Sequence, residues 1–328
     1  MVTEMTAALS GSTRKKWEAL LRKAGLEPED LPEQTALVWD GDTLAATGSR
    51  QRNLLKYLAV DPDYRGADLT ATVLSALKAD AFEKGYDRLF LYTKPENRSL
   101  LGGLFFYDVA MTERVLLMED RRGGFRAYLN ALPQEQYEGD VGAVVMNCNP
   151  FTKGHRYLVE TAAKECTHLY VFVLSEDASR FSARDRMEMV RLGTADLPNV
   201  TVLPTGPYMV SAATFPTYFL KDREQAQLVQ CDLDVAIFGS HIAPVLGITH
   251  RYVGTEPLSP TTKQYNEALK TMLPQKGIEV KELSRLETGG EVISASEVRA
   301  KLDAGEDIRH LVPDTTYHYL FQGGNNHG

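Results

Sequence analysis

From Val141 onward, short apolar runs alternate with amphipathic segments. The apolar runs have strand length and are VGAVVM (141–146), LYVFVL (169–174), VTVLP (200–204), DVAIFG (234–239) and GIEVKEL (277–283). The segments between them favour helices and are GHRYLVETAAKE (154–165), ARDRMEMVRLGTA (183–195) and a longer stretch within 217–230. This alternation predicts a doubly wound parallel sheet with right-handed crossovers, in which ligands lie beyond the carboxyl ends of the strands.

The first third of the chain has a different order and predicts a separate α/β domain. Residues 14–26 form an amphipathic pattern ended by glycine, and residues 36–39, 43–49 and 54–60 have the composition of three antiparallel strands. Residues 88–93 and 114–119 are further strand candidates. Paired glycines at 123 and 124 begin a stretch that ends polar, so the sequence predicts domains at 1–135 and 136–328.

Composition limits the partners of such a protein. The net charge of -8 and a pI near 5.5 argue against nucleic-acid binding, which depends on a basic face. Three cysteines without metal-ligand spacing indicate a reducing cytosol. No apolar run approaches the ~20 residues that span a bilayer, and the first residues lack the order of a signal peptide. We therefore expect a cytoplasmic protein without a membrane or nucleic-acid partner.

The turn after the first strand of the second domain has the composition of a phosphate site. A helix N-terminus presents unpaired N–H groups and a partial positive charge, so it attracts phosphate even in an acidic protein. Gly154 lets a ligand approach the backbone, and His155 can donate a hydrogen bond to a phosphoryl oxygen. Thr152 offers a hydroxyl and Lys153 a charge. The alternative is that His155 caps or packs against the helix start and Lys153 is a solvated surface charge.

A second helix start near the end of the chain carries a comparable set of side chains. In ISASEVR (293–299), Ser294 and Glu297 fit a capping box, which by itself indicates a well-capped helix. Ser294, Ser296 and Arg299 would also place two hydroxyls and a guanidinium near that helix N-terminus. Two such helix starts could clamp one triphosphate.

Other polar residues are weaker candidates. Arg184 and Arg186 in FSARDR are possible phosphate ligands or members of a surface ion pair. Gly239 and Ser240 in FGSHIA follow a predicted strand and could meet a nucleotide together with His241. Cys148 is explained better by packing than by thioester chemistry. His168, and His250 beside Arg251, are interpreted as surface residues.

Together, TKGH (152–155) and ISASEVR resemble the T/H-x-G-H and I-S-x-S/T-x-x-R signatures of the nucleotidyltransferase superfamily. Over nearly the whole chain, NCNPFTKGHRYLVE, FSARDRMEMV, FGSHIAPVLGITHRYVGTEP, TTKQYNEALK and LVPDTTYHYL resemble the citrate lyase ligase family. Thr152 stands where the broad superfamily has its first histidine, which weakens any role for a second imidazole there.

The resemblance implies an AMP-forming acid–thiol ligase. ATP, with Mg²⁺ carried on its phosphates, and acetate would give acetyl-adenylate. The acetyl group would then pass to the thiol of a CoA-like prosthetic group on the acyl carrier subunit of citrate lyase. The residues expected to act in catalysis are His155, Lys153 and Arg299. Those expected to bind the nucleotide are Asn149, Pro150, Phe151, Thr152, Gly154, Arg184, Arg186, Gly239, Ser240, Ser294 and Ser296.

Two alternatives fit the same signatures. One is an adenylyltransferase acting on a small phosphate ester, such as phosphopantetheine or nicotinamide mononucleotide. The other is a nucleotide-sensing or carrier-binding module that has lost its chemistry.

The N-terminal third resembles the GNAT acetyltransferase fold, on LAVDPDYRGADLTATVLSAL (58–77) and NRSLLGGLFFYDV (97–109). The first stretch is similar to the acyl-CoA loop of that fold, but Asp68 and Thr70 occupy positions where the loop has small residues. A carboxylate at a pyrophosphate-binding turn weakens the attraction for phosphate. The domain is therefore expected to receive the CoA-like arm instead of catalysing acetyl-CoA transfer.

Overall fold

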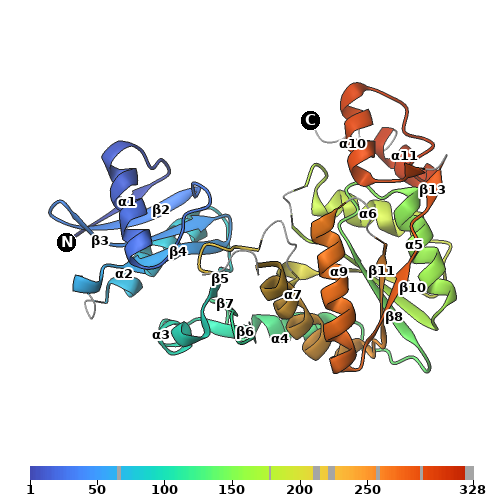
Figure 1. The fold of residues 1–328 in the computed structure, drawn as a ribbon, viewed down its shortest axis with the longest axis horizontal. Helices are drawn as coiled ribbons and strands as arrows, with labels where there is room; N and C mark the ends of the chain where they lie inside the picture. The colour runs from blue at the N-terminus through green and yellow to red at the C-terminus, as the bar shows by residue number, and fades with distance from the viewer. Residues whose placement is uncertain are drawn as a thin grey trace. The chain divides into compact units, whose positions relative to one another are not determined.

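The computed structural model describes residues 1–64, 68–176, 179–209, 215–220, 226–255, 259–288 and 291–321. The chain divides into two compact units (Figure 1). The first comprises Met1–Ala127 and Phe215–Val229, and the second comprises Tyr128–Thr214 and Gln230–Gly328. The sequence predicts one boundary after residue 135, whereas the first stretch of the first unit ends at Ala127 and a later segment, Phe215–Val229, also belongs to this unit. Tyr218 accounts for that return, because its ring packs 4.6 Å from the ring of Tyr57 inside the first unit.

The first unit contains a seven-stranded sheet with the order β1-β2-β3-β4-β5-β7-β6. Its strands are β1 (Val2–Thr6), β2 (Gln34–Asp40), β3 (Thr43–Gln51), β4 (Leu54–Val60), β5 (Phe90–Thr93), β6 (Tyr107–Met111) and β7 (Leu116–Glu119). Its helices are α1 (Gly11–Lys23), α2 (Leu69–Glu83), α3 (Arg98–Gly103) and α4 (Gly124–Ala131), the last of which crosses the unit boundary. The antiparallel pairing predicted for β2, β3 and β4 is confirmed.

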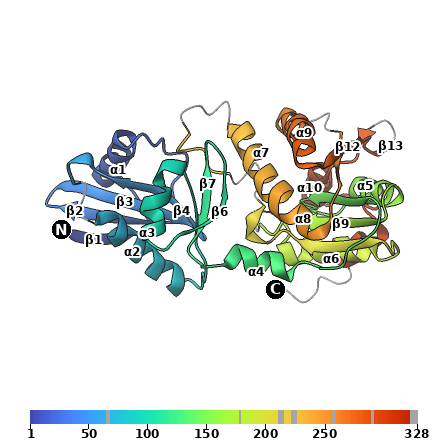
Figure 2. The same ribbon diagram turned by 90° about the horizontal axis from the view of Figure 1, so that it is seen from below.

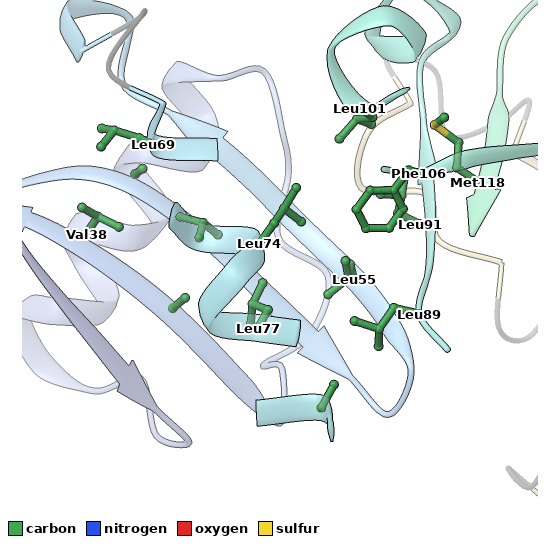
Figure 3. Packing of buried hydrophobic residues seen from close by; sticks show 14 of the residues in the cluster. Val38, Leu55, Leu69, Leu74, Leu77, Leu89, Leu91, Leu101, Phe106 and Met118 are labelled. Atoms are coloured by element: carbon green, nitrogen blue, oxygen red, sulfur yellow. The ribbon is translucent and has the colours of Figure 1, made fainter. Parts of the chain in front are cut away.

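The centre of this sheet opens into a cleft. β4 and β5 run parallel, and in the described residues they pair only at Leu54 with Phe90 and Leu55 with Leu91. Beyond these pairs, a cavity of about 550 Å³ lies between the two strands, α3 and the first turn of α2. Figure 3 shows the core below it, where Leu74 and Leu77 of α2 pack over the sheet near Val38 and Leu55.

The second unit contains a five-stranded parallel sheet with the order β10-β9-β8-β11-β12, which confirms the predicted doubly wound fold. The strands are β8 (Val141–Met146), β9 (His168–Val173), β10 (Val200–Pro204), β11 (His250–Gly254) and β12 (Glu279–Leu283). The helices are α5 (Lys153–Lys164), α6 (Ala183–Thr194), α7 (Ala226–Ile237), α8 (Ala243–Leu246), α9 (Pro260–Met272), α10 (Ala295–Ala304) and α11 (Asp314–Phe321). The first residues of α7, up to Val229, belong to the first unit. A small hairpin of β13 (Glu287–Thr288) and β14 (Glu291–Val292) precedes α10.

Helices cover both faces of this sheet (Figure 2). On one face, Val144, Val171 and Tyr252 pack in a core with α5 and α6. On the other face, Phe172 of β9 meets Phe238, which begins a π-helical turn (Phe238–Ile242) after α7. α9 lies on the same side as α7, because Tyr265 of α9 donates to Asp234 of α7. The strand order reverses direction between β8 and β11, which is where ligands bind in such sheets.

The prediction of a strand at 234–239 is wrong, because these residues belong to α7 and the π-helical turn. A short apolar run does not distinguish a strand from a buried helix, and Val235, Ile237 and Phe238 are buried as helical residues. The fourth strand of this sheet in chain order is instead β11. Its residues His250 and Arg251 are buried instead of lying on the surface. His168 is buried as well.

Among the described residues, Ala226–Leu246 is the helical stretch long and apolar enough to cross a membrane. Most of it is buried within the protein, as in a core helix. Packing is therefore a sufficient reason for its composition.

Candidate functional site

The first turn of α5 is closed by a capping box in which histidine replaces the usual glutamate or glutamine. The Thr152 hydroxyl accepts a hydrogen bond from the backbone N–H of His155 at 3.2 Å. In return, the Nδ1 atom of His155 accepts from the backbone N–H of Thr152 at 3.1 Å. His155 therefore caps the helix through its Nδ1 atom, as the alternative interpretation expects.

The cap fixes the protonation state of the imidazole. Because a backbone N–H can only donate, Nδ1 carries no proton, and the neutral ring holds its proton on Nε2. Burial, and then the positive charge of Arg285, lower the pKa of His155 to about 4. The Phe151 ring stacks on the imidazole, with centroids 5.9 Å apart and planes 12° apart. His155 is therefore a neutral, oriented donor near physiological pH.

The second signature packs directly against this turn. A Cβ atom on Gly154 would lie 3.2 Å from the carbonyl oxygen of Ile293, so glycine permits the approach. Arg299 donates to the carbonyl oxygen of Asn149 at 2.7 Å and to the Ser296 hydroxyl at 3.0 Å. The structure thus joins the two motifs that the sequence separates by more than a hundred residues.

A cavity of about 360 Å³ opens where the two motifs meet. Thr152, Gly154 and His155 of the first motif and Ser294 of the second line it. Ser294 also caps α10, since its hydroxyl accepts from the backbone N–H of Glu297 at 3.1 Å. The remaining walls come from the ends of β8 and β11, from α9 and from the residues after β12. This location agrees with the expected ligand site beyond the strand ends.

Several predicted residues support the cavity without lining it. Phe151 and Pro150 are buried behind the turn, and the Asn149 side chain accepts from the backbone N–H of Phe181. Lys153 extends its Nζ atom to the carbonyl oxygen of Arg309 at 3.0 Å. Arg299 donates to the Ser296 hydroxyl and to the Asn149 carbonyl group in the turn.

Arg186 differs most from its predicted role as a phosphate ligand. Its side chain is fully buried, and its guanidinium donates to the carbonyl oxygens of Asn147, Leu174, Glu176 and Phe181 and to the Asn147 side chain. These bonds connect the residues that follow β8 and β9, so Arg186 fixes the two strand ends relative to each other. Arg184 is exposed on α6 and does not line the cavity.

Gly239 and Ser240 also lie away from the cavity. A Cβ atom on Gly239 would meet Lys276 and Leu273, which precede the start of β12 at Glu279. That is the opposite end of the sheet from the site. The prediction assumed a strand ending at Gly239, whereas this segment is helical.

Two arginines of the cavity were not among the predicted site residues. Arg285 follows β12 and lines the cavity beside His155. Its place directly after a predicted parallel strand was a usable signal. Arg251 lies inside β11, a strand that the sequence pattern did not reveal, and it lines the same cavity.

Cys148, next to the turn, is buried. Burial raises the pKa of its thiol, so the reactive thiolate is disfavoured and packing explains this residue. Among the described residues, no group of three or more histidine, cysteine, aspartate or glutamate side chains could hold a metal ion.

Comparison with known proteins assigns the family. Residues 141–320 match a family model described as the citrate lyase ligase C-terminal domain. The chain is 39% identical over 317 residues to a [citrate [pro-3S]-lyase] ligase of Klebsiella pneumoniae, covering 94% of this chain and 93% of that protein. The chain belongs to the citrate lyase ligase family. A ligase of the same name from Escherichia coli is 38% identical over 288 residues, covering 85% of this chain and 82% of that protein.

The first unit of this citrate lyase ligase family member has a separate match. Residues 7–102 match a model described as the acetyltransferase (GNAT) family. Solved structures similar to this region include a putative N-acetyltransferase from Lactobacillus plantarum, with 14% identity, a TM-score of 0.32, and coverage of 36% of this chain and 97% of that one. An acyl-CoA N-acyltransferase from Pseudomonas aeruginosa has 12% identity, a TM-score of 0.32, and coverage of 37% and 100%. The family match supports the expected GNAT-like first domain.

The state of His155 can be measured directly. We expect histidine ¹⁵N spectra to show the Nε2–H tautomer for His155 and no titration between pH 8 and about 5. Between the folded pKa of about 4 and the ordinary value of about 6.5, the unfolded chain binds more protons than the folded chain. The free energy of unfolding should therefore fall as the pH decreases through this window, and less so in His155→Asn. A ring protonated on Nδ1, or a titration near pH 6.5, would contradict the geometry.

Proposed function

We propose that this citrate lyase ligase family member activates acetate with ATP and acetylates citrate lyase. Acetyl-adenylate and pyrophosphate form first. The acetyl group then passes to the thiol of a CoA-like prosthetic group on the acyl carrier subunit, which activates citrate lyase. The observation that carries the proposal is the neutral, oriented His155 at a helix N-terminus inside a cavity shared by both motifs. The reaction is placed in the cytoplasm and involves no nucleic acid or membrane.

The first step needs position and charge stabilisation instead of a protein nucleophile. A carboxylate oxygen of acetate attacks the α-phosphorus of ATP, an O–P bond forms, and the bond to the pyrophosphate leaving group breaks. The α5 N-terminus and the Nε2–H group of His155 face the phosphate oxygens in this arrangement. Arg285 adds positive charge, and the Ser294 hydroxyl lies at the second helix start.

A neutral histidine suits this step. It donates to the phosphate without gaining or losing a proton, so this hydrogen bond is available at every pH well above 4. The charge that develops on the phosphate oxygens then meets donors that are already in place.

Mg²⁺ would enter with ATP. The described residues offer no cluster of metal ligands, so phosphate oxygens would hold most of its coordination sphere. When bound, the ion neutralises charge on the leaving pyrophosphate.

The remaining predicted residues are proposed to act through the turn. Arg299 holds the Asn149 carbonyl group, and Lys153 fixes the first turn of α5 to the segment at Arg309. Both would position the turn without contacting the substrate, because neither lines the cavity.

The cleft of the first unit is proposed to receive the CoA-like arm. It is largely apolar, with Leu58 and Ala59 of β4 and Leu101 of α3 among its walls. Tyr218, from the returning segment, forms part of its wall and contacts the Tyr92 carbonyl group at 3.5 Å. Asp68 lies at the start of α2 in a left-handed conformation, where its carboxylate would repel a pyrophosphate. The apolar walls fit the thiol-bearing end of such an arm.

The His155→Asn variant tests the adenylation site. The asparagine oxygen can still accept the Thr152 N–H group, but no donor remains at the Nε2 position. A lost hydrogen bond to a charged group is worth about 1.5–3 kcal/mol, so acetate-dependent ATP–pyrophosphate exchange should fall about 10-fold or more with little change in melting temperature. His318→Asn, exposed on α11, is the matched control.

Two results would count against this assignment. Normal exchange in His155→Asn would remove the residue from the phosphate site. Exchange that depends on a phosphate ester such as phosphopantetheine, and not on acetate, would favour the alternative adenylyltransferase.

A bulky residue in the first unit tests the division of labour. Ala71→Trp places an indole at the cleft, on the first turn of α2. Acetylation of the carrier subunit should fall about 10-fold or more, because the thiol loses its positioning surface, while acetate-dependent exchange stays within about 2-fold. Ala79→Trp, exposed on the same helix, should change neither rate. Equal carrier acetylation in the two variants would remove the cleft from thiol delivery.

A further inference from the structure

Arg251 has an unusual position for a charged residue. It lies in β11, between β8 and β12 in the parallel sheet, opposite Ala143 on one side and Val280 on the other. Only 3% of it is exposed. Strands inside a parallel sheet are normally apolar on both faces, and a buried charge is unfavourable unless it is paired.

The guanidinium of Arg251 has no such pairing in the described part of the chain. Its Nε and Nη1 atoms are buried without a hydrogen-bond partner, and no described carboxylate forms an ion pair with it. Asp234, a buried acid of α7, accepts a hydrogen bond from the Tyr265 hydroxyl at 2.5 Å. The Phe238 ring lies 4.4 Å from the guanidinium carbon and covers one face of the group.

Arg251 lines the same cavity as His155. Phe238 packs against the guanidinium, whose planar edge presents parallel N–H groups that match the two oxygens of a carboxylate. The cavity of about 360 Å³ also has to hold the reacting phosphate, which leaves space for a short acid.

We propose that Arg251 binds the carboxylate of the acetate substrate. This inference rests on the proposed activation of acetate and adds the residue that recognises the acid. In this arrangement, Arg251 holds acetate from the α7–α9 side of the sheet, while His155 and Arg285 hold the phosphate at the strand ends. A phosphate oxygen of ATP is the other anion that could reach Arg251, and the experiment separates the two.

Acetate-dependent ATP–pyrophosphate exchange is measured in the full chain for Arg251→Lys, Arg251→Met and Arg285→Lys. Lysine keeps the charge of Arg251 but loses the planar fork, so the KM for acetate should rise about 10-fold or more while the KM for ATP stays within about 2-fold. Arg285→Lys should show the reverse pattern. Arg191→Lys, exposed on α6, is the control and should match the unaltered protein.

Arg251→Met should raise the KM for acetate further, since both charge and fork are lost. An unchanged KM for acetate in a folded Arg251 variant would overturn the proposal, and so would a rise confined to the KM for ATP. Failure of both Arg251 variants to fold would assign the residue to the fold and would also overturn it. Absence of acetate-dependent exchange in the unaltered protein would overturn the proposed function itself, and this inference with it.

Discussion

The site depends on a close approach between two backbones. The first turn of α5 comes so near the segment before α10 that a methyl group on Gly154 would lie 3.2 Å from the Ile293 carbonyl oxygen. Arg299 then reaches across to the Asn149 carbonyl group and fixes the two motifs together. Without this contact there would be two ordinary capped helices. With it, the N-terminal ends of α5 and α10 border one cavity.

Two buried arginines illustrate how the fold separates support from recognition. Arg186 donates to several carbonyl groups and to the Asn147 side chain, so its guanidinium is engaged in holding the strand ends. Arg251 has buried donors that find no partner among the described residues, and each such group costs about 1–3 kcal/mol. These unpaired donors in a central strand destabilise the fold, and a ligand that supplies acceptors to Arg251 would remove this destabilisation. The proposed role of His155 follows the same logic, since its Nδ1 atom serves the helix cap and its Nε2–H group would donate to the substrate.

Local features were predictable from the sequence, and long-range contacts were not. Alternating apolar and amphipathic segments predicted the parallel sheet, and the residues at positions 152–155 and 294–299 predicted both helix starts, because caps depend on neighbours in sequence. The run at 234–239 was assigned to a strand because its apolar composition suits either element, and its tertiary contacts decide for a helix. The membership of Phe215–Val229 in the first unit and the different environments of Arg186 and Arg251 depend on partners far away in the chain.

The most direct test of the account follows oxygen atoms from acetate. If the acetate carboxylate attacks the α-phosphorus of ATP, the attacking oxygen stays with AMP when the carrier thiol displaces the acetyl group. Acetate labelled with oxygen-18 should therefore give AMP with a single heavy oxygen, together with unlabelled pyrophosphate, when the protein acetylates the citrate lyase carrier subunit. Mass spectrometry of the nucleotide and phosphate products measures both. Label in inorganic phosphate, or AMP without label, would contradict activation of acetate as its adenylate.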